Sequence, residues 1–323
     1  MKLFLNKEIP EAGMTLLKSS NKIELLQPTS EDLSHEEWLQ YCKKAEVIAN
    51  VGHNAFDKDF FQKCPNVKAI ALFSVGYDHV DIEEATKRNI SVSNTPDVLS
   101  KATSDVAFLL MQSVARKASY NFNKVKSGKW NTNLKPTEDL GQELYGKTIG
   151  IYGLGRIGYE MAKKCKYAFD MKIIYHNRNA NPKIEEELGA KYVSFDELIK
   201  YSDVLSIHAN YTQEQENLFN RNVFEHMKKN SILINTARGG FINETDLYNA
   251  LTDHKIWGAG LDVTNPEPMD STSKLLALSN VCVLPHIGSA TIEARNGMAR
   301  LMAENILTFA ENKQMPTIVN QFS

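Results

Sequence analysis

Residues 147–158 read KTIGIYGLGRIG, and residues 171–178 read MKIIYHNR. The β-branched run at 148–152 predicts a strand, the glycines after it fit the pattern G-x-G-x-x-G, and a helix is predicted over Arg156–Phe169. A second apolar run at 171–175 predicts the next strand. A strand, a glycine turn, a helix and a strand within about 30 residues are the setting in which this pattern indicates dinucleotide binding.

Each glycine of the G-x-G-x-x-G pattern is required for a physical reason. Gly153 permits a tight turn, Gly155 lets a pyrophosphate approach the backbone, and Gly158 lets the helix pack closely on the strand. The first helical residues, Arg156 and Ile157, offer unpaired N–H groups to the phosphates. The alternative is a tight turn without a ligand, and the setting of the motif favours the dinucleotide.

The end of the second strand indicates which dinucleotide binds. A site that prefers NAD usually carries Asp or Glu there, which accepts a hydrogen bond from the ribose 2′-OH. Residues 175–178 read YHNR and contain no carboxylate. Asn177 can donate a hydrogen bond and Arg178 can face a 2′-phosphate, with His176 as a further candidate. We therefore expect NADP(H) to be preferred and NAD(H) to be possible; the alternative is a solvated loop whose Arg contacts nothing.

The composition is that of an ordinary globular protein of about two domains. The 323 residues are 42% apolar and 24% charged, and the net charge is −2, so no nucleic acid or anionic membrane is expected as a partner. No apolar run is long enough to span a membrane and the N-terminus has no signal peptide, so a cytoplasmic protein is expected. The cysteines are far apart and predict buried free thiols at Cys42, Cys64, Cys165 and Cys282.

Short strand-like runs alternate with helical patterns along most of the chain. This alternation predicts an α/β fold with parallel sheets that helices cover on both faces. Ligands are expected in the loops at the carboxyl ends of such strands. The expected strands are 2–5, 23–26, 47–49, 69–73, 90–92, 149–152, 172–175, 191–194, 204–208, 231–235, 258–262 and 281–284.

Two helices are expected to connect two domains. Residues 95–97 (TPD) interrupt the alternation, and one long helix is then expected from about Leu99 to Ser127, with Val106, Leu109, Leu110 and Val114 on one stripe. A last helix at 291–312 is expected to return to the first domain. The predicted domains are therefore a discontinuous substrate domain, 1–97 plus 289–323, and a dinucleotide-binding domain, 98–288.

Three loops after late strands each carry one candidate for chemistry: Arg238 in NTARGG, Glu267 in LDVTNPEP and His286 in VLPHIGSAT. Such a trio at adjacent strand ends suits hydride transfer to a 2-oxo acid. Arg238 can bind the substrate carboxylate with two hydrogen bonds. His286 can donate a proton to the reduced oxygen, and Glu267 can hold the other ring nitrogen and favour the imidazolium.

Each of these three residues alone has a simpler explanation: a surface charge for Arg238, a turn residue for Glu267 and a strand-end histidine for His286. Their combination with a dinucleotide fold favours catalysis. His208 and His79 are the rival histidines, because both follow strand-like runs. No metal site is expected, since no two His, Cys or Asp residues show ligand spacing on one element.

As a set, the motifs resemble the D-isomer-specific 2-hydroxyacid dehydrogenases along nearly the whole chain. They are SVGYDHVD, TPDVLSKATSDVA, GIYGLGRIG, NTARGG, GAGLDVTNPEP and LPHIGSAT, in family order. The resemblance implies two Rossmann- or flavodoxin-like domains with parallel sheets around a central cleft, and Arg238, Glu267 and His286 as the catalytic trio. It implies that the backbone at Val75 and Gly76 binds the substrate carboxylate. It also implies that the following residues lie near the cofactor: Thr103, Thr212, Ala237, Asp262 and Gly288.

Within this family the chain is most similar to the glyoxylate and hydroxypyruvate reductases, including those that also reduce 2-ketogluconate. This implies that a homodimer reduces a small 2-oxo acid to a D-2-hydroxy acid with NADPH. Trp130 lies in a polar segment and could be either a contact with the second subunit or a core anchor. The sequence departs from the family at 208–212 (HANYT), with Asn210 and Tyr211 in place of the usual Pro and Leu. The alternatives are an NAD-linked dehydrogenase of another substrate, such as D-lactate, and a non-catalytic nucleotide sensor similar to the family's corepressors.

Overall fold

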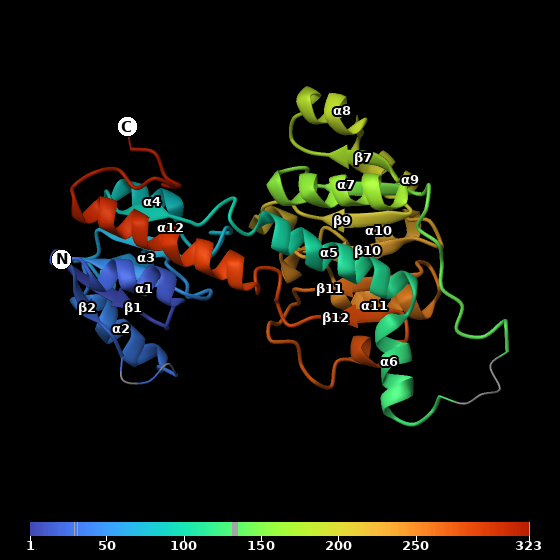
Figure 1. Ribbon diagram of the computed structural model, residues 1–323, viewed down its shortest axis with the longest axis horizontal. Helices are drawn as coiled ribbons and strands as arrows, with labels where there is room; N and C mark the ends of the chain where they lie inside the picture. Colours follow the sequence, from blue (N-terminus) through green and yellow to red (C-terminus); the bar gives the residue numbers. More distant parts are fainter. Residues whose placement is uncertain (29, 31, 131–134, 323) are drawn as a thin grey trace. The chain divides into compact units, whose positions relative to one another are not determined.

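A computed structural model of the chain describes residues 1–28, 30, 32–130 and 135–322. The chain divides into two compact units. Unit 1 comprises Met1–Leu99 and Ala290–Ser323, and unit 2 comprises Ser100–Ser289. Unit 1 therefore contains both ends of the chain, which are blue and red in Figure 1.

Unit 1 is built on a five-stranded sheet in the order β2-β1-β3-β4-β5, and every neighbouring pair is parallel. This is the strand order of flavodoxin-like folds. The central strands β3 and β4 are buried along their whole length, as expected for parallel strands covered on both faces. The strands are β1 (Lys2–Leu5), β2 (Glu24–Leu26), β3 (Val47–Asn50), β4 (Ala69–Leu72) and β5 (Ser91–Ser93).

Helices from both ends of the chain cover this sheet. They are α1 (Glu11–Lys18), α2 (His35–Lys44), α3 (Lys58–Lys63), α4 (Ile82–Lys87) and α12 (Ile292–Ala310). The α1 and α12 backbones pack so closely that a Cβ at Gly13 would lie 2.4 Å from the carbonyl oxygen of Ala299. On α12 the side chains of Met298, Met302 and Ile306 are buried. A separate aromatic core joins α2 and α3 to the sheet through Phe4, Trp38, Phe56, Phe60 and Phe61.

Unit 2 has a seven-stranded parallel sheet in the order β12-β11-β10-β9-β6-β7-β8. Counted from β6, this is the Rossmann order 3-2-1-4-5-6 with one more strand at the edge. The order reverses between β6 and β9, and ligands bind at such a switch point. The predicted α/β class with two parallel sheets is confirmed. The strands are β6 (Thr148–Tyr152), β7 (Lys172–His176), β8 (Lys191–Tyr192), β9 (Val204–Ile207), β10 (Ile232–Asn235), β11 (Gly258–Leu261) and β12 (Val281–Val283).

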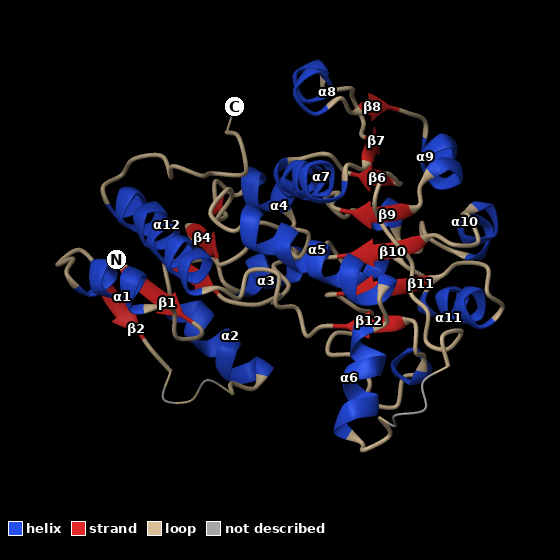
Figure 2. Ribbon diagram, turned by 45° about the vertical axis from the view of Figure 1, so that its right-hand side comes forward, coloured by secondary structure: helices blue, strands red, loops and turns tan. Residues whose placement is uncertain are grey.

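Figure 2 shows α5 and α7 on one face of the unit 2 sheet and α9, α10 and α11 on the other. The predicted helix Arg156–Phe169 is confirmed as α7. Ser194, expected at the end of a strand, instead caps α9 through a capping box with Glu197. The helices are α5 (Ser100–Ala115), α6 (Ala118–Lys126), α7 (Arg156–Phe169), α8 (Pro182–Leu188), α9 (Phe195–Tyr201), α10 (Arg221–His226) and α11 (Glu244–Thr252).

The prediction of one helix from Leu99 to Ser127 is wrong, because α5 and α6 are separate. Lys117 lies between them in the left-handed conformation, with φ 51°. The carbonyl groups of the last turn of α5, which would accept the next helical hydrogen bonds, accept from other donors. The Trp257 indole donates to Val114 O at 3.3 Å, and the Gln142 N–H donates to Ala115 O at 2.9 Å. These long-range contacts override the local helix propensity, so the sequence pattern does not reveal the break.

The predicted apolar stripe of this segment is only partly right. Leu110 and Val114 are buried, whereas Leu109 is 51% exposed. The buried face of α5 also includes Ala107 and Met111, which pack against β6 and α7 in the core of unit 2. The exposed Leu109 therefore remains available for another contact.

The four cysteines are free and buried, as predicted. Burial raises the pKa of the Cys42 and Cys165 thiols far above the ordinary range and that of Cys64 to about 11. These thiols are therefore protonated and unreactive at neutral pH.

In the described part of the chain, none of the helices is both long and apolar enough to cross a membrane.

Candidate active site

The glycine loop follows β6 at the switch point of the unit 2 sheet. Gly153 has φ 96°, which side chains rarely tolerate, and a Cβ there would lie 2.4 Å from the backbone nitrogen of Ala209. A Cβ at Gly158 would lie 2.4 Å from Gly153 O and 2.9 Å from the Ile151 side chain. These two glycines therefore allow close approaches within the protein itself.

Gly155 differs from its neighbours, because a Cβ there would meet no heavy atom within 4 Å. The open space lies at the start of α7, whose N-terminus has no side-chain cap. The N–H groups of the first turn, which begins with Arg156 and Ile157, and the positive end of the helix dipole favour an anion there. This cradle fits the pyrophosphate of a dinucleotide.

Asn177 and Arg178 follow β7, beside the glycine loop. The Asn177 Oδ1 accepts a hydrogen bond from the Leu154 N–H at 2.6 Å, and its Nδ2 lies 3.5 Å from Leu154 O. The Asn177 amide thus ties the strand-end loop to the glycine loop. Arg178 is exposed.

The His176 ring is held by packing at the end of β7. It stacks between the rings of Tyr152 and Tyr192, each with a centroid distance of 6.0 Å. Its Nδ1 lies 2.9 Å from Val193 O, and the Tyr192 hydroxyl donates to Asn177 O at 3.1 Å. His176 therefore acts as part of the wall that supports the Asn177 loop.

The loop after β9 carries the sequence departure at 210 and 211. The Tyr211 ring packs edge-on against Phe241 with a centroid distance of 5.2 Å, and a Cβ at Gly240 would lie 2.7 Å from that ring. Tyr211 fits because residue 240 is glycine. Thr212 caps the short 3-10 helix η1 (Gln213–Gln215), and its hydroxyl bonds to the Gln215 side chain at 3.2 Å.

His208 is engaged in the fold. Its Nε2 lies 2.8 Å from the Ser206 hydroxyl, and its Nδ1 lies 3.4 Å from the Thr236 hydroxyl. Burial lowers the pKa of His208 to about 3, so the ring is neutral at physiological pH. A histidine in this state is a poor proton donor. The other rival, His79, belongs to unit 1 and packs against Phe56.

Arg238 follows β10 in a loop that the buried side chain of Asn235 holds. The Asn235 Nδ2 donates to Arg238 O at 2.8 Å, and its Oδ1 accepts from the Ala237 N–H at 3.0 Å. The Arg238 guanidinium donates back to Ala237 O at 2.8 Å through Nη1. The sheet therefore fixes the backbone from which the arginine side chain extends.

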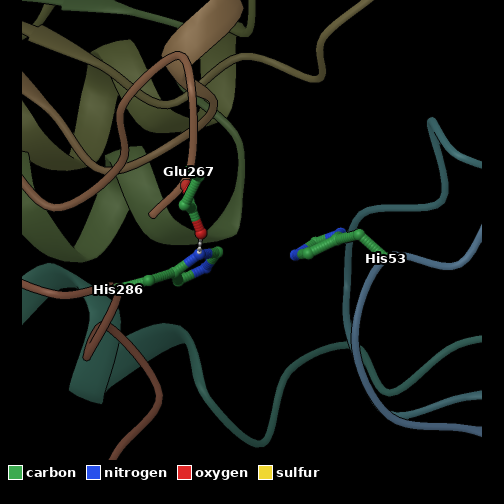
Figure 3. A group of neighbouring side chains, drawn as sticks. All are labelled: His53, Glu267 and His286. Atoms are coloured by element: carbon green, nitrogen blue, oxygen red, sulfur yellow. Dashed lines mark hydrogen bonds and ion pairs between the residues drawn. The ribbon is translucent and has the colours of Figure 1, made fainter. Parts of the chain in front are cut away.

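Glu267 and His286 form a hydrogen-bonded pair between Oε1 and Nδ1, shown in Figure 3. The two residues come from the loops after the adjacent strands β11 and β12. The Thr264 N–H approaches the other Glu267 oxygen, Oε2, at 3.5 Å. Because Nδ1 faces the carboxylate, Nε2 is the ring nitrogen that points away from Glu267. The third residue in Figure 3, His53, belongs to unit 1.

Asp262 holds the backbone of the His286 loop. It is 1% exposed, and its two carboxylate oxygens accept from the N–H groups of Ile287 and Gly288, each at 2.8 Å. Burial raises the pKa of Asp262. These two hydrogen bonds and the nearby His286 lower that pKa and so partly offset the effect of burial. A Cβ at Gly288 would lie 3.1 Å from both Asp262 and Thr103, so these three predicted residues lie together.

A pocket of about 430 Å³ adjoins the Glu267–His286 pair within unit 2. Its lining combines these two residues and Asp262 with the apolar side chains of Met269, Leu276 and Val283. An apolar wall lowers the local dielectric constant, which strengthens the interactions of charged groups beside it.

The predicted substrate-binding backbone lies in unit 1, in the loop after β4. The Asn94 Nδ2 donates to Val75 O at 2.8 Å, and the Ser74 hydroxyl donates to Gly76 O at 2.7 Å. Both carbonyl groups are thus held within the loop. All the other predicted site residues belong to unit 2, where those described above lie at or near the carboxyl edge of the sheet.

The supporting residues Asn235, Ser206 and Thr264 were not singled out from the sequence. Each is a buried polar residue at or just beyond the end of a strand that carries a predicted site residue. That combination is the signal that points to them, because a buried polar side chain needs a hydrogen-bond partner.

Comparisons with known proteins agree with this geometry. Residues 108–288 match the model of the D-isomer specific 2-hydroxyacid dehydrogenase NAD binding domain. The chain is 42% identical to the glyoxylate reductase of Thermococcus litoralis, over 99% of this chain and 97% of the relative. A solved structure of a glyoxylate reductase from Paecilomyes thermophila is similar, with a TM-score of 0.88 and 34% identity over 99% of this chain and 98% of that chain. The structure of the Aquifex aeolicus D-lactate dehydrogenase complexed with NAD and lactic acid is also similar, with a TM-score of 0.86 and 26% identity over 100% of both chains. The chain therefore belongs to the D-isomer specific 2-hydroxyacid dehydrogenase family and is an NAD(P)-dependent oxidoreductase.

Proposed function

We propose that this enzyme uses NADPH to reduce a small 2-oxo acid to the D-2-hydroxy acid. The substrate candidates are glyoxylate and hydroxypyruvate, with 2-ketogluconate as a larger one. The observation that carries the proposal is the Glu267–His286 pair at the carboxyl edge of a Rossmann sheet, in the loops that follow the two strands next to that of Arg238. The similarity to proteins named glyoxylate reductase supports the choice of substrate class.

The bound nicotinamide supplies the hydride, and the substrate oxygen then needs a proton. We assign His286 as the donor, from Nε2. Glu267 accepts the hydrogen bond from Nδ1–H, fixes the orientation of the ring and stabilises its protonated form. Arg238 is assigned to the substrate carboxylate, because its planar guanidinium can donate two parallel hydrogen bonds. The N–H groups of Val75 and Gly76 are assigned to the same carboxylate.

Unit 2 is proposed as the cofactor domain and unit 1 as the substrate domain, close to the predicted boundaries 98–288 and 1–97 plus 289–323. The glycine loop supports the assignment, since Gly155 leaves open space at the helix N-terminus. The proposed cofactor-binding residues are Thr103, Gly153, Gly155, Arg156, Ile157, Gly158, Asn177, Arg178, Thr212, Ala237, Asp262 and Gly288.

The preference for NADPH is proposed on Arg178. It is an exposed cation after β7, in a loop that contains no carboxylate to accept from a ribose 2′-OH. Because the Asn177 Oδ1 already accepts from Leu154, Arg178 is the residue of this pair that we assign to the 2′-phosphate. NADH remains a possible second cofactor.

A homodimer is proposed, joined through unit 2. Large apolar side chains of this unit are exposed in the single chain, including Leu109 at 51%, Phe122 at 67% and Trp130 at 68%. Large contiguous areas of exposed apolar surface are typical of association sites. Sedimentation at micromolar concentration tests the proposal, and a monomer of 36.4 kDa at every concentration would contradict it.

The direct test follows NADPH and NADH absorbance with glyoxylate, hydroxypyruvate, pyruvate and 2-ketogluconate as substrates. Oxidation of NADPH by one of the short 2-oxo acids is expected. Faster turnover with NADH would overturn the role of Arg178 and leave the reaction standing. Tight cofactor binding without turnover on any substrate would refute the reductase and favour a nucleotide sensor.

The role of His286 is tested by His286→Asn, with the exposed His226→Asn as control. We expect kcat to fall by about 10²–10⁴-fold in the first variant, because a positioned proton donor contributes on that scale, and to stay unchanged in the control. NADPH binding serves as the folding check for both. Near-normal turnover of His286→Asn would sink the assignment.

A further inference from the structure

The peptide group between Thr264 and Asn265 belongs to the loop of Glu267 and touches the loop of Arg238 at Gly239. We propose that Glu244 is a positioning residue that holds this peptide and thereby sets the geometry of Glu267 and Arg238. The inference rests on the proposed reductase function. It concerns a side chain that lies outside the motifs used to recognise the site.

The first observation is the contact itself. The Glu244 Oε1 accepts a hydrogen bond from the Asn265 N–H at 2.8 Å, between residues 21 positions apart. Glu244 is the first residue of α11, and Asn265 lies in the loop after β11. The bond therefore ties the start of a helix to a loop that is distant in sequence.

A simpler explanation of Glu244 is an acidic residue in the first turn of a helix, where it favours the dipole. The local geometry argues against that explanation. Asn243 already caps α11, since its Oδ1 accepts from the Asp246 N–H at 3.0 Å. The Glu244 side chain is instead partly buried. Burial raises the pKa of its carboxyl group, and the hydrogen bond from the Asn265 N–H partly offsets this rise. Glu244 thus gives up hydration for a contact with the loop.

The second observation lies on the other side of the same peptide. A Cβ at Gly239 would lie 2.0 Å from Thr264 O and 2.7 Å from Asn265 N. The residue after Arg238 therefore rests directly against the peptide that Glu244 holds. Only a glycine permits this approach, so the Arg238 loop and the Glu267 loop share one backbone support.

The third observation connects the peptide to the Glu267 carboxylate. The Thr264 N–H approaches Glu267 Oε2 at 3.5 Å, and the Thr264 hydroxyl donates to Pro266 O at 2.8 Å. Oε1 of the same carboxylate bonds His286. A shift of the Thr264–Asn265 backbone is therefore transmitted to the carboxylate that orients the proposed proton donor.

Loss of the Glu244 acceptor should impair turnover more than binding. Without it, the Asn265 N–H must turn to water and the 264–267 segment loses its tie to α11. Small misplacements of catalytic groups cost up to about a hundredfold in rate. We expect Glu244→Ala to lower kcat by about tenfold or more, while the KM for NADPH changes less than about threefold, because the glycine loop is untouched.

The matched variants are Glu244→Gln, which keeps an acceptor oxygen, and Asp196→Ala, which removes an exposed first-turn carboxylate from α9. Glu244→Gln should restore kcat to within about threefold of the wild type, and Asp196→Ala should leave it unchanged. A Gln variant as impaired as the Ala variant would overturn the hydrogen bond as the cause. Equal losses in Glu244→Ala and Asp196→Ala would reduce Glu244 to a helix-dipole residue.

A double-mutant cycle tests whether Glu244 acts through Glu267. In a Glu267→Gln background, Glu244→Ala should lower kcat by less than about threefold, because the carboxylate that it positions is already gone. If Glu244→Ala lowered kcat by the same factor in the Glu267→Gln background as in the wild type, the proposal would be overturned. The Glu244→Met variant, of similar length and without an acceptor, gives the same comparison should the Ala variant fold poorly.

Amide exchange separates this inference from the proposed function. In Glu244→Ala, the Asn265 N–H should exchange faster than in the wild type, measured by mass spectrometry on a fragment spanning 262–270. If the wild type reduced no 2-oxo acid, the proposed function would be wrong. Faster exchange of the Asn265 N–H in Glu244→Ala would still support the Glu244 contact in that case. Unchanged exchange and unchanged kcat in an active enzyme would refute the inference.

Discussion

Replacing Gly155 with alanine should weaken cofactor binding without unfolding the protein. A Cβ at this position meets no heavy atom within 4 Å, and the backbone has φ −89° and ψ −156°, an extended conformation that alanine adopts. The alanine reduces the entropy of the unfolded chain, which stabilises the fold by about 0.4–1 kcal/mol. It is also a poorer N-cap than glycine by a similar amount. The net change in the free energy of unfolding should therefore lie within about 0.5 kcal/mol.

The effect on the cofactor should be much larger, because the new methyl group occupies the space proposed for the pyrophosphate. We expect the Kd for NADPH to rise about ten- to a hundredfold, which corresponds to about 1.4–2.8 kcal/mol of binding free energy. NADPH fluorescence titration measures the Kd, and urea denaturation measures the free energy of unfolding.

Gly158→Ala, at the third residue of α7, is the matched comparison. Its Cβ would lie 2.4 Å from Gly153 O, about 1 Å short of ordinary contact, so the helix or the turn must move. Such overpacking costs about 1–3 kcal/mol, only part of which the better helix propensity of alanine offsets. This variant should lose both stability and NADPH affinity. Unchanged NADPH affinity in Gly155→Ala, or equal destabilisation of the two variants, would refute the assignment of Gly155 to the pyrophosphate.

Three further outcomes are expected. Asn177→Asp keeps the acceptor for the Leu154 N–H and adds a negative charge beside the proposed 2′-phosphate site, so the ratio of kcat/KM for NADPH to that for NADH should fall at least about tenfold; an unchanged ratio would place the 2′-phosphate elsewhere. Arg238→Lys keeps the charge and loses the two-pronged geometry, so kcat/KM for glyoxylate should fall about a hundredfold, and a normal value would argue against a carboxylate contact. The pKa of His208 falls from 6.5 to about 3 on folding, so the unfolded chain binds more protons between these values and the free energy of unfolding falls as the pH drops, by at most about 2 kcal/mol at pH 5. Urea denaturation at pH 7 and pH 5 should show a smaller difference for His208→Gln than for the wild type, and an equal difference would remove His208 as the cause.

Local patterns predicted the regular elements well, for identifiable reasons. The β-branched run before Gly153 and the glycine spacing were enough to place β6 and the start of α7, because the turn, the strand and the helix are set by neighbouring residues. The start of α11 is also set locally, because the Asn243 side chain accepts from the Asp246 N–H three residues further on. These predictions depend on contacts within about five residues.

The errors come from contacts between residues that are far apart in the chain. The break between α5 and α6 depends on Trp257 and Gln142, which take the carbonyl groups of the last turn of α5. The helical pattern on either side gives no sign of it. The sequence likewise does not reveal that the Asn177 Oδ1 accepts from the Leu154 N–H, 23 residues away. The place of Asn177 beside the cofactor stays a prediction.

The sequence by itself determined the α/β class, the glycine loop and the identity of the residues proposed for chemistry, because these depend on short-range periodicity and on residue chemistry. Only the tertiary structure decided that Glu267 bonds His286, that Asp262 holds the loop after β12, and that Gly239 and Glu244 meet at the Thr264–Asn265 peptide. The physical reason is that the carboxyl ends of parallel strands bring together loops separated by about 20 or more residues. Which side chains then pair depends on strand order and loop packing.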